Sequence, residues 1–531
     1  MAKGKRAAFI VVLDGCPTRA LKLARTPTID EIAAQGAYTE ICRSVCPTVT
    51  YTAHASIVTG RWPAEHGLVG NVFYDRESGR LVDLDAEPPD ERLRAPTLFE
   101  RESALSLAVG EPITRGADLV ISKAQVQAHD LWEQDAFALR RAAELVRTRA
   151  PRLAVINLPG IDRVGELYGP TSRELLEHLE EVDALLEEFT RVLDGVYEDY
   201  LLILLADHGM VPVRENADLA ELLEGLEAVI CPSHRAAHIY LADRAELGEA
   251  LERLRSDGRF ELVLTREEMA EYGLDSPLSG DIFVAAKEGY ELGPEELRGS
   301  HGGVSQDEMM VFLIANKPEY ADLLKDACIT RAAEAVERYL REARAIERAR
   351  ELLARADPAH GWEHTERVLK LATDLALEHG ADVEAVRLAA IFHDVGRKAG
   401  EREPGEHAEG SARLAAAFLL AEGWPEERVE LVRQAILKHH AEPGKLRRLE
   451  ERILWEADKL DALGLVGLAR CLLEAGSRGE DIEEAVEHMM RDLEAFRASF
   501  SLPTAREKAA KRVAAALKAI RELKDELEGR A

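Results

Sequence analysis

Short apolar runs alternate with amphipathic stretches over the first 340 residues of the chain. Residues 8–14, 153–160 and 200–209 are apolar, and each run ends in an acidic residue or a glycine turn. Between these runs lie segments such as residues 172–193, in which apolar positions recur with helical spacing. Strands that alternate with helices predict an α/β fold with a parallel sheet, and functional residues gather beyond the carboxyl ends of such strands.

The pattern changes near residue 330. From residues 332–356 to the end of the chain, nearly every segment has helical character and is rich in Ala, Leu, Glu and Arg. We place a domain boundary near residue 343, inside or just after a connecting helix. The sequence therefore predicts an α/β domain at residues 1–342 and an all-α domain at residues 343–531.

The composition narrows the range of partners. The 531 residues carry a formal charge of −30, from 68 basic and 98 acidic side chains, and this balance disfavours a nucleic acid polymer. No stretch approaches the ~20 apolar residues of a membrane-spanning helix. The six cysteines form no C-x-x-C pair, which is typical of a reduced protein. We expect a soluble, cytoplasmic protein with no membrane partner.

The stretch PTVTYTAHASIVTG, residues 47–60, contains no Asp, Glu, Lys or Arg, although 31% of the chain is charged. A threonine before a helix is commonly an N-cap, and Thr50 taken alone fits that role. The alternative is a nucleophile, because a metal ion can activate a threonine hydroxyl. The segment after Thr50 is predicted to form a helix whose N-terminal N–H groups face a phosphate, and a carboxylate there would compete with it.

Candidate metal ligands are distributed over the whole first domain. They combine carboxylates, a hydroxyl and imidazoles, a mixture that zinc and similar divalent ions accept. Two such ions a few Å apart can hold the attacking and leaving oxygens of a phosphoryl transfer. The candidates are Asp14, Thr50, Asp162, Glu166, Asp207, His208 and His301.

Five motifs of this domain carry a family resemblance. They are VVLDG at residues 11–15, the segment 47–71, DRVGELYGP at 162–170, ADHGM at 206–210 and GSHGG at 299–303. In this order they resemble the nucleotide pyrophosphatase/phosphodiesterase branch of the alkaline phosphatase superfamily. The resemblance implies an alkaline-phosphatase-like fold and two divalent metals, with zinc as the first choice and manganese as the alternative.

The resemblance also implies the roles of single residues. One metal would be held by Asp14, Thr50, Asp207 and His208. The other would be held by Asp162, His301 and residue 166. Asn71 matches an asparagine that holds a phosphate oxygen beside the backbone N–H of Thr50, while His54 and His66 are expected to be structural.

Position 166 departs from the family pattern. The family reads D-x-x-G-H, whereas residues 162–166 read D-R-V-G-E. Glutamate can ligate zinc, but its charge and hard oxygen favour manganese or magnesium more than histidine would. The alternative is that Glu166 is an ordinary solvated carboxylate and that the second metal site is weak.

The substrate class follows from the charges that the motifs offer. Removal of a terminal phosphate usually calls for an arginine that binds the extra charge, and no arginine of the motifs clearly does so. Asn71 suits a diester, which carries one charge less. A phosphonoacetate hydrolase or a phosphomonoesterase remains an alternative, and a phosphomutase is disfavoured because that branch generally uses serine.

The helical domain contains a second set of candidate ligands. His360 and His364 are spaced to share one helix face, and Asp458 comes from a later helix. The adjacent pair His393–Asp394 follows an apolar run, and we expect it in the middle of a helix. There it would be costly to bury without a metal or polar partners.

The order H…HD…D, formed by His364, His393–Asp394 and Asp458, resembles the HD-domain metal-dependent phosphohydrolases over residues 343–480. The phrase D-x-L-D-A-L-G at residues 458–464 belongs to the same resemblance. It implies one or two divalent metals, drawn from Mn, Mg, Fe, Co and Ni. Additional ligands of two-metal members would be His407, His439 and His440, for which a surface or packing role is the alternative.

These patterns together predict a two-domain metallohydrolase of small phosphate esters or nucleotides. In the first domain Thr50 would form a covalent phosphothreonine, and in the second a metal-bound hydroxide would attack directly. The competing hypothesis is a helical domain that senses a nucleotide or mediates oligomerisation and regulates the first domain. An assembly of identical chains is compatible with the sequence.

Overall fold

The computed structural model describes residues 5–354, 360–397, 404–496 and 499–530. The chain forms two compact units, Met1–Leu340 and Arg341–Ala531, which we call the N-terminal and C-terminal units. The division falls within helix α13 (Arg331–Leu353). Each unit has its own apolar core, so each is described separately.

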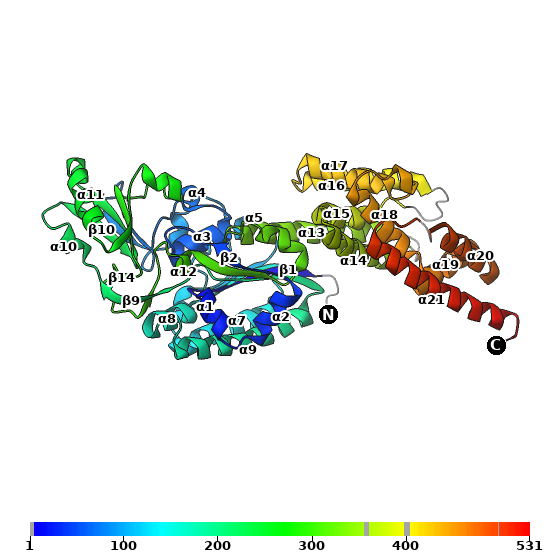
Figure 1. Cartoon of the computed structure of the whole chain (residues 1–531), viewed down its shortest axis with the longest axis horizontal. Helices are drawn as coiled ribbons and strands as arrows, with labels where there is room; N and C mark the ends of the chain where they lie inside the picture. Colours follow the sequence, from blue (N-terminus) through cyan, green and yellow to red (C-terminus); the bar gives the residue numbers. More distant parts are fainter. Residues whose placement is uncertain (1–4, 355–359, 398–403, 497–498, 531) are drawn as a thin grey trace. The chain divides into compact units, whose positions relative to one another are not determined.

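A seven-stranded sheet forms the centre of the N-terminal unit (Figure 1). Its order is β2-β16-β8-β1-β7-β5-β6. The strands are β1 (Arg6–Leu13), β2 (Ala37–Arg43), β5 (Ser106–Val109), β6 (Leu119–Ile121), β7 (Leu153–Leu158), β8 (Asp199–Leu205) and β16 (Met310–Ala315). The three predicted strands are confirmed as β1, β7 and β8, and they pair in parallel. Strand β16 runs antiparallel to β8 and β2, so the sheet is mixed rather than purely parallel.

Helices cover both faces of this sheet (Figure 1). One face carries α1 (Thr18–Leu23), α2 (Pro27–Gln35), α7 (Gln134–Arg149) and α9 (Arg173–Val196), and the other carries α3 (Thr50–Thr59). Helix α9 confirms the amphipathic segment predicted at residues 172–193. Its leucine, valine and phenylalanine side chains are buried in the core that also contains the sheet.

Parallel strands bring their carboxyl ends to one edge of the sheet, and the candidate residues lie at that edge. Asp14 directly follows β1, and Asp207 lies two residues after β8. Asp162 lies in the first turn of α8 (Pro159–Tyr168), which follows β7. Gly15 has a positive φ of 61°, and a Cβ there would lie 2.1 Å from the Asp162 carboxylate. The glycine therefore permits the close approach of β1 and α8.

A second, antiparallel sheet extends the N-terminal unit. Its order is β10-β11-β13-β12, and it has a small apolar core of its own. The strands are β10 (Ala228–Ser233), β11 (Ala236–Leu241), β12 (Phe260–Thr265) and β13 (Ile282–Ala286). Strand β15 (Gly299–Ser300) pairs with β9 (Val211–Asn216), and this pairing positions His301 directly after β15.

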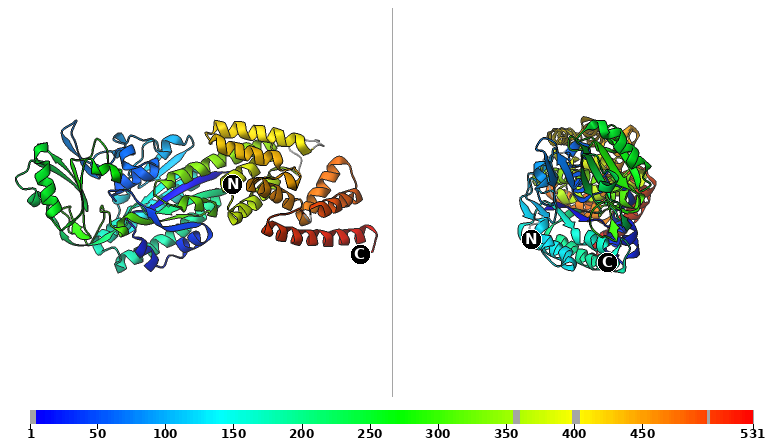
Figure 2. Two further views of the ribbon diagram at one scale, coloured as in Figure 1. Left: turned by 45° about the horizontal axis from the view of Figure 1, so that its top comes forward. Right: turned by 90° about the vertical axis from the view of Figure 1, so that its left-hand side faces the viewer.

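The described residues of the C-terminal unit form helices and no strand, as the sequence predicts. Helices α16 and α17 lie side by side in Figure 1 and in the left view of Figure 2. Its helices after α13 are α14 (Trp362–His379), α15 (Val383–Phe392), α16 (Pro404–Ala421), α17 (Glu426–Lys438), α18 (Leu449–Asp461), α19 (Gly464–Arg478), α20 (Ile482–Phe496) and α21 (Pro503–Leu527).

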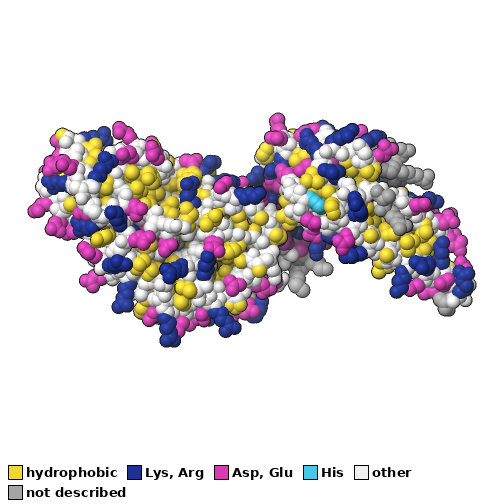
Figure 3. All heavy atoms as spheres, viewed as in Figure 1, with side chains coloured by type: hydrophobic (Ala, Val, Ile, Leu, Met, Phe, Trp, Pro, Cys, Tyr) yellow, Lys and Arg dark blue, Asp and Glu magenta, His cyan; other side chains and the backbone are white. Residues whose placement is uncertain are grey.

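The surface carries mixed charges. On the face drawn in Figure 3, acidic and basic side chains are interspersed over each unit. Within the described ranges, every helix is too short or too polar to cross a membrane.

Candidate metal centres

Asp14, Asp207 and His208 form the first group of the N-terminal unit. All three are buried, and their ligand atoms lie within 4.8 Å of one another. His208 Nε2 is 3.2 Å from Asp207 Oδ2 and 3.8 Å from Asp14 Oδ1. The hydroxyl oxygen of Thr50 lies 3.5 Å from the same His208 nitrogen. The structure thus brings together four predicted residues from three separate segments.

Hydrogen bonds orient the two carboxylates of this group. Asp207 Oδ1 accepts the backbone N–H of Gly15 at 3.0 Å, and Asp14 Oδ2 accepts the amide of Asn157 at 2.7 Å. The other oxygens, Asp14 Oδ1 and Asp207 Oδ2, are buried and have no hydrogen-bond partner among the described residues. Buried polar atoms are normally paired, so these two oxygens are suited to a cation.

Thr50 is the first residue of α3, and the N-cap is Val49. The N-cap interpretation of Thr50 is therefore wrong. Every residue of α3 is buried, which accounts for the absence of charged side chains from the stretch 47–60. Asn71 lies at the same end of α3, where its Oδ1 accepts the backbone N–H of Tyr51 at 3.3 Å. Its amide nitrogen is then the group left to bind an acceptor.

We call Asp162, Glu166 and His301, the predicted ligands of the second metal, the second group. Ligand atoms of Asp162, His208 and His301 lie within 4.8 Å of one another, and so, separately, do those of Glu166, His234 and His301. His301 Nε2 is 3.7 Å from Asp162 Oδ1 and 4.0 Å from Glu166 Oε1. The Nδ1 of His301 donates to the carbonyl of Thr48 at 2.9 Å, which leaves Nε2 as the acceptor that faces the carboxylates. Glu166 is 4% exposed, so its interpretation as an ordinary solvated carboxylate is wrong.

The two groups are adjacent. The rings of His208 and His301 are stacked, with 3.8 Å between their centroids and 14° between their planes. Since ligand atoms of Asp162, His208 and His301 also lie within 4.8 Å of one another, the two candidate metal positions are side by side. Such proximity is what a two-metal phosphoryl-transfer site needs.

Burial shifts the acid–base properties of these side chains. It raises the pKa of Asp14 to about 6, and it raises the pKa values of Asp162, Glu166 and Asp207 above their usual range. The same burial lowers the pKa of His208 to about 4. Four buried carboxylates beside two imidazoles of lowered pKa are electrostatically unfavourable, although His54 and Arg163 offset part of the charge, and the donor set fits a pair of divalent metals.

Two histidines of the stretch around α3 make contacts within the fold. His54 Nδ1 bonds to Glu111 at 2.8 Å, and its Nε2 lies 3.7 Å from Asp207. Burial alone would lower the pKa of His54, but the neighbouring carboxylates raise it to about 9. His66 Nε2 lies 2.9 Å from the hydroxyl of Ser56, and burial lowers the pKa of His66 to about 3.

One neighbour of the second group was not found from the sequence. His234 lies in the turn between β10 and β11, and its Nδ1 is 3.6 Å from Glu166 Oε1. The segment SHRAAH that contains it has no motif spacing, so nothing in the sequence singled it out.

In the C-terminal unit, His364, His393, Asp394 and Asp458 converge on one point. The Nε2 atoms of His364 and His393 are 3.2 Å apart. His364 Nε2 is 3.4 Å from Asp458 Oδ1 and 3.8 Å from Asp394 Oδ2. These residues come from α14, the end of α15 and α18, and the structure brings all four predicted ligands together.

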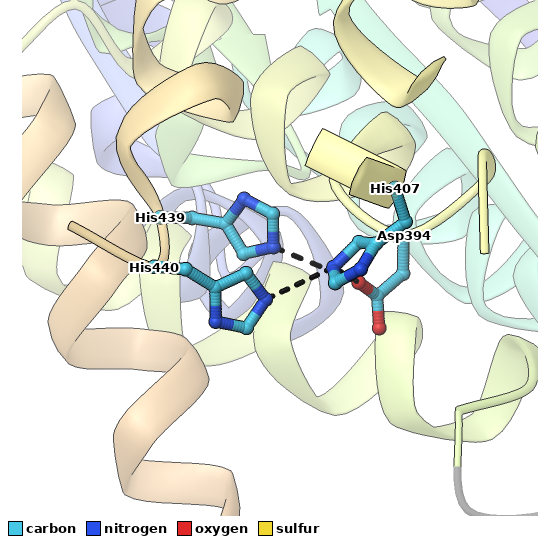
Figure 4. Close-up of side chains that lie close together, drawn as sticks. All are labelled: Asp394, His407, His439 and His440. Atoms are coloured by element: carbon cyan, nitrogen blue, oxygen red, sulfur yellow. Dashed lines mark hydrogen bonds and ion pairs between the residues drawn. The ribbon is translucent and has the colours of Figure 1, made fainter. Parts of the chain in front are cut away.

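The other oxygen of Asp394 faces a second set of imidazoles. Asp394 Oδ1 is 3.3 Å from His407 Nε2 and 3.6 Å from His439 Nε2. His440 Nε2 lies 2.9 Å from His407 Nε2. Figure 4 shows the three imidazoles directed toward Asp394. Their convergence excludes a scattered surface location, and it makes Asp394 a carboxylate shared by two ligand groups.

The histidines of this site are held with Nε2 directed inward. His364 Nδ1 donates to Asp461 at 2.8 Å, His393 Nδ1 to the carbonyl of Ala390 at 2.8 Å, and His439 Nδ1 to that of Ile436 at 2.6 Å. Outer hydrogen bonds of this kind fix the tautomer of a metal-binding histidine. Asp461 lies in the D-x-L-D-A-L-G phrase, but the sequence predicted no role for it.

Two local predictions about this unit were wrong. Helix α15 ends at Phe392, so His393–Asp394 follows the helix instead of lying in its middle. The chain turns there and packs on α16, where a Cβ on Gly396 would lie 2.4 Å from the backbone nitrogen of Ser411. His360 precedes α14 and does not share a helix face with His364, although their ring centroids are only 6.0 Å apart.

A cavity of about 450 Å³ opens at the ligands of the C-terminal unit. Asp394, His407, His440 and Asp458 line it. Basic side chains also contribute to its wall, and they are Arg397, Lys459, Arg470 and Arg478. Cations beside a metal-binding group provide a suitable environment for a phosphate ester.

Family models match a segment of each unit. The family model "Type I phosphodiesterase / nucleotide pyrophosphatase" matches residues 8–303, and the model of the HD domain matches residues 361–463. Human ectonucleotide pyrophosphatase/phosphodiesterase family member 1 is 28% identical over 197 residues, which are 35% of this chain and 21% of that protein. An uncharacterized pyrophosphatase/phosphodiesterase of Schizosaccharomyces pombe is 26% identical over 223 residues, which are 39% of this chain and 45% of that protein. The matched region thus spans less than half of either relative.

Solved structures show the same fold for the N-terminal unit. A phosphonoacetate hydrolase from Sinorhizobium meliloti 1021, in complex with phosphonoformate, has a TM-score of 0.53 and 22% identity, covering 63% of this chain and 95% of that one. Murine ectonucleotide pyrophosphatase/phosphodiesterase 5, in an inactive threonine-to-alanine form with AMP, has a TM-score of 0.54 and 19% identity, covering 63% and 95%.

Proposed function

Because this chain belongs to the type I phosphodiesterase / nucleotide pyrophosphatase family, we propose that it is a metal-dependent hydrolase of small phosphate esters with two sites. The observation that carries the proposal is the position of the Thr50 hydroxyl, 3.5 Å from His208 at the start of α3 and beside two buried carboxylates with free oxygens. A nucleophile, an anion-binding helix terminus and a metal-binding group meet there.

In the proposed reaction, Thr50 Oγ1 gives its proton to solvent and forms a bond to phosphorus as the bond from phosphorus to the leaving oxygen breaks. The leaving oxygen takes up a proton, and water later cleaves the phosphothreonine. The Asn71 amide and the N–H groups at the start of α3 would donate to the phosphoryl oxygens. Two divalent cations would supply the charge that activates the hydroxyl and stabilises the leaving group. One would be held by Asp14, Thr50, Asp207 and His208, and the other by Asp162, Glu166 and His301.

The substrate proposed for this site is a small diester, such as a nucleotide derivative. Asn71 is neutral, and a diester carries one charge less than a monoester. The murine neighbour binds AMP and is inactive with one threonine replaced by alanine, which supports a nucleotide-type ligand and a threonine nucleophile. Zinc or manganese is proposed, since Glu166 adds a hard oxygen to the imidazoles.

A phosphonoacetate-like substrate is the alternative that a specific observation favours. The Lys123 ammonium lies 3.2 Å from the hydroxyl of Tyr51, the residue after Thr50, and its charge partly opposes the burial that raises the pKa of Asp162. A substrate with a second anionic group could use this cation, although Asp85 already pairs with it at 2.7 Å. Parallel assays of a diester, a monoester and phosphonoacetate separate these possibilities.

For the C-terminal unit we propose a second hydrolytic site with one or two divalent cations. The shared carboxylate of Asp394 and the basic side chains of the cavity wall, which also contains Glu474 and Asp492, support a phosphate-bearing ligand held through a metal. The alternative is a regulatory module that binds the same ligand class without turnover.

All six cysteines have free thiols, which agrees with the proposed cytoplasmic location.

The decisive experiment replaces Thr50 in the full-length chain. Thr50→Ala should abolish cleavage of an aryl phosphodiester, and Thr50→Ser should retain a measurable part. Thr52→Ala is the matched control, because Thr52 is a buried hydroxyl on the same helix without a hydrogen-bond partner among the described residues. Full diester cleavage by a folded Thr50→Ala protein would refute the proposed nucleophile.

A further inference from the structure

His234 lies among the side chains of the second metal group. Its Nδ1 is 3.6 Å from Glu166 Oε1, and its ring lies against that of His301 with 4.1 Å between centroids. One ligand atom from each of Glu166, His234 and His301 lies within 4.8 Å of the others. The imidazole is therefore in reach of any cation bound between Glu166 and His301.

The backbone at His234 is unusual for a histidine. Ser233 and Ala236 are paired, so His234 and Arg235 form a two-residue hairpin loop. The φ of His234 is +53°, a conformation that glycine adopts readily and other residues rarely. Strained backbone of this kind is concentrated at functional sites. Glycine would adopt this backbone conformation without strain. The imidazole is what histidine adds to glycine, so we look for the function of this residue in its side chain.

Both neighbours of His234 are fixed to the rest of the site. Ser233 Oγ accepts the backbone N–H groups of Asn71 at 3.0 Å and Val72 at 3.2 Å. The backbone N–H of Arg235 donates to the carbonyl of His301 at 2.9 Å. The guanidinium of Arg235 is fully buried and pairs with Glu308 at 2.9 Å. The turn thus holds His234 at a set position relative to Asn71 and His301.

Three distances between neighbouring donor atoms are close to those around a common ion, and Asp162 also belongs to the neighbouring group with His208 and His301. A tetrahedral metal with ligands at about 2.1 Å separates its ligand atoms by roughly 3.4 Å. Observed separations are 3.6 Å for His234–Glu166, 3.7 Å for Asp162–His301 and 4.0 Å for Glu166–His301. We propose that His234 is a ligand of the second metal, together with Asp162, Glu166 and His301; this assignment rests on the two-metal site proposed above.

The consequence is a change in the chemistry of the second metal position. Two carboxylates alone with one imidazole form a hard ligand set, whereas a second imidazole makes the set more favourable for zinc. Its Nδ1 is the coordinating atom, because that atom faces Glu166. The side chain is 28% exposed, so the metal position would be reached from the side of the β10–β11 turn.

The structural alternative is that His234 only stacks on His301. His234→Gly separates the two roles, because glycine suits the positive φ and leaves the turn relaxed while removing the imidazole. His234→Asn is the second variant, since asparagine also tolerates this backbone. His129→Ala is the control: this exposed histidine stacks on Phe137 and belongs to no metal group among the residues described.

Metal binding is measured on the full-length chain by chelator competition with Zn²⁺ and with Co²⁺. Both His234 variants should bind one cation per chain at least about tenfold more weakly, with the others unchanged. With Co²⁺ bound, the NMR spectrum should lose one shifted imidazole N–H resonance. Wild-type affinity for every cation in His234→Gly overturns the assignment.

Failure of the proposed function has a different signature. If Thr50→Ala keeps full diester cleavage while His234→Gly still weakens one cation, the reaction assignment fails and the ligand assignment stands. If Thr50→Ala is inactive and His234→Gly binds every cation normally, the reaction assignment stands and His234 has only a packing role.

Discussion

His364 donates its Nδ1 hydrogen to Asp461 across 2.8 Å. Asp461 also accepts from Arg367 at 2.7 Å and from Arg470 at 2.9 Å. Burial favours the neutral acid, but the bond from His364 and the bonds from the arginines hold the pKa of Asp461 well below its usual range. A permanently charged carboxylate therefore orients the imidazole that faces Asp458 and Asp394.

The first prediction tests this orientation. Asp461→Asn removes the charge and nearly preserves the shape, so Mn²⁺ affinity of the C-terminal site should fall by about 10- to 100-fold. Excess Mn²⁺ should restore binding. Asp374→Asn, an exposed position on the same helix as His364, is the control and should leave affinity unchanged. Chelator competition measures both. Unchanged affinity in Asp461→Asn would show that Asp461 does not position His364.

The second prediction concerns metal preference at Glu166. Glu166→His removes one buried negative charge and adds a softer donor, so the metal that gives the highest diesterase activity should shift toward zinc. Glu166→Ala should lose affinity for one cation. Activity and metal content are measured with Zn²⁺, Mn²⁺ and Mg²⁺ in turn. If both variants keep the metal stoichiometry and the metal preference of the unmutated chain, residue 166 is not a ligand.

The third prediction separates the two units. The C-terminal unit has its own apolar core, so residues 341–531 should fold alone and bind at least one divalent cation. Replacing His393 and Asp394 with alanine removes two ligands, and phosphate-ester hydrolysis by this fragment should vanish. Circular dichroism and metal analysis of the fragment accompany the assay.

The same double replacement in the full-length chain tests coupling. Diester cleavage that depends on Thr50 should persist, because every candidate ligand of that site lies at or before His301. A folded double variant that loses diester cleavage would instead favour a C-terminal unit that regulates the first one.

The fourth prediction concerns acid stability. His238 is buried in the second sheet of the N-terminal unit, where Nε2 donates to the carbonyl of Val69 at 3.1 Å and Nδ1 accepts the N–H of Gly280 at 3.3 Å. Burial lowers the pKa of His238 from 6.5 to about 4. The unfolded chain therefore binds the proton first as the pH falls, and stability is lost between pH 6.5 and about 4, by about 2 kcal/mol at pH 5.

His238→Gln supplies a donor and an acceptor that do not titrate. The variant should lose less stability between pH 7.5 and pH 5 than the unmutated chain does. Hydrogen exchange of the β11 backbone at both pH values provides the measurement, and His129→Gln, on an exposed histidine, is the control. An identical pH dependence in His238→Gln and the unmutated chain would contradict the assignment.

Much of the architecture could be predicted because burial determines the local pattern of apolar residues along the sequence. Strands β1, β7 and β8 are continuous apolar runs, since a sheet covered on both faces buries every side chain. Helix α9 shows one apolar face because only one face meets the core. The grouping of Asp14 with Asp207 follows from the same pattern, because parallel strands end at a common edge.

The tertiary structure decided what depends on contacts between distant segments. Glu166 is buried because α8 packs against β15, which its own segment does not reveal. His234 reaches Glu166 from 68 positions away along the chain, through a turn fixed by Asn71 and His301. Hydrophobic periodicity and short motifs encode which side of an element is buried. Packing geometry decides which distant polar atom faces a metal position, and the order of residues along the chain does not show it.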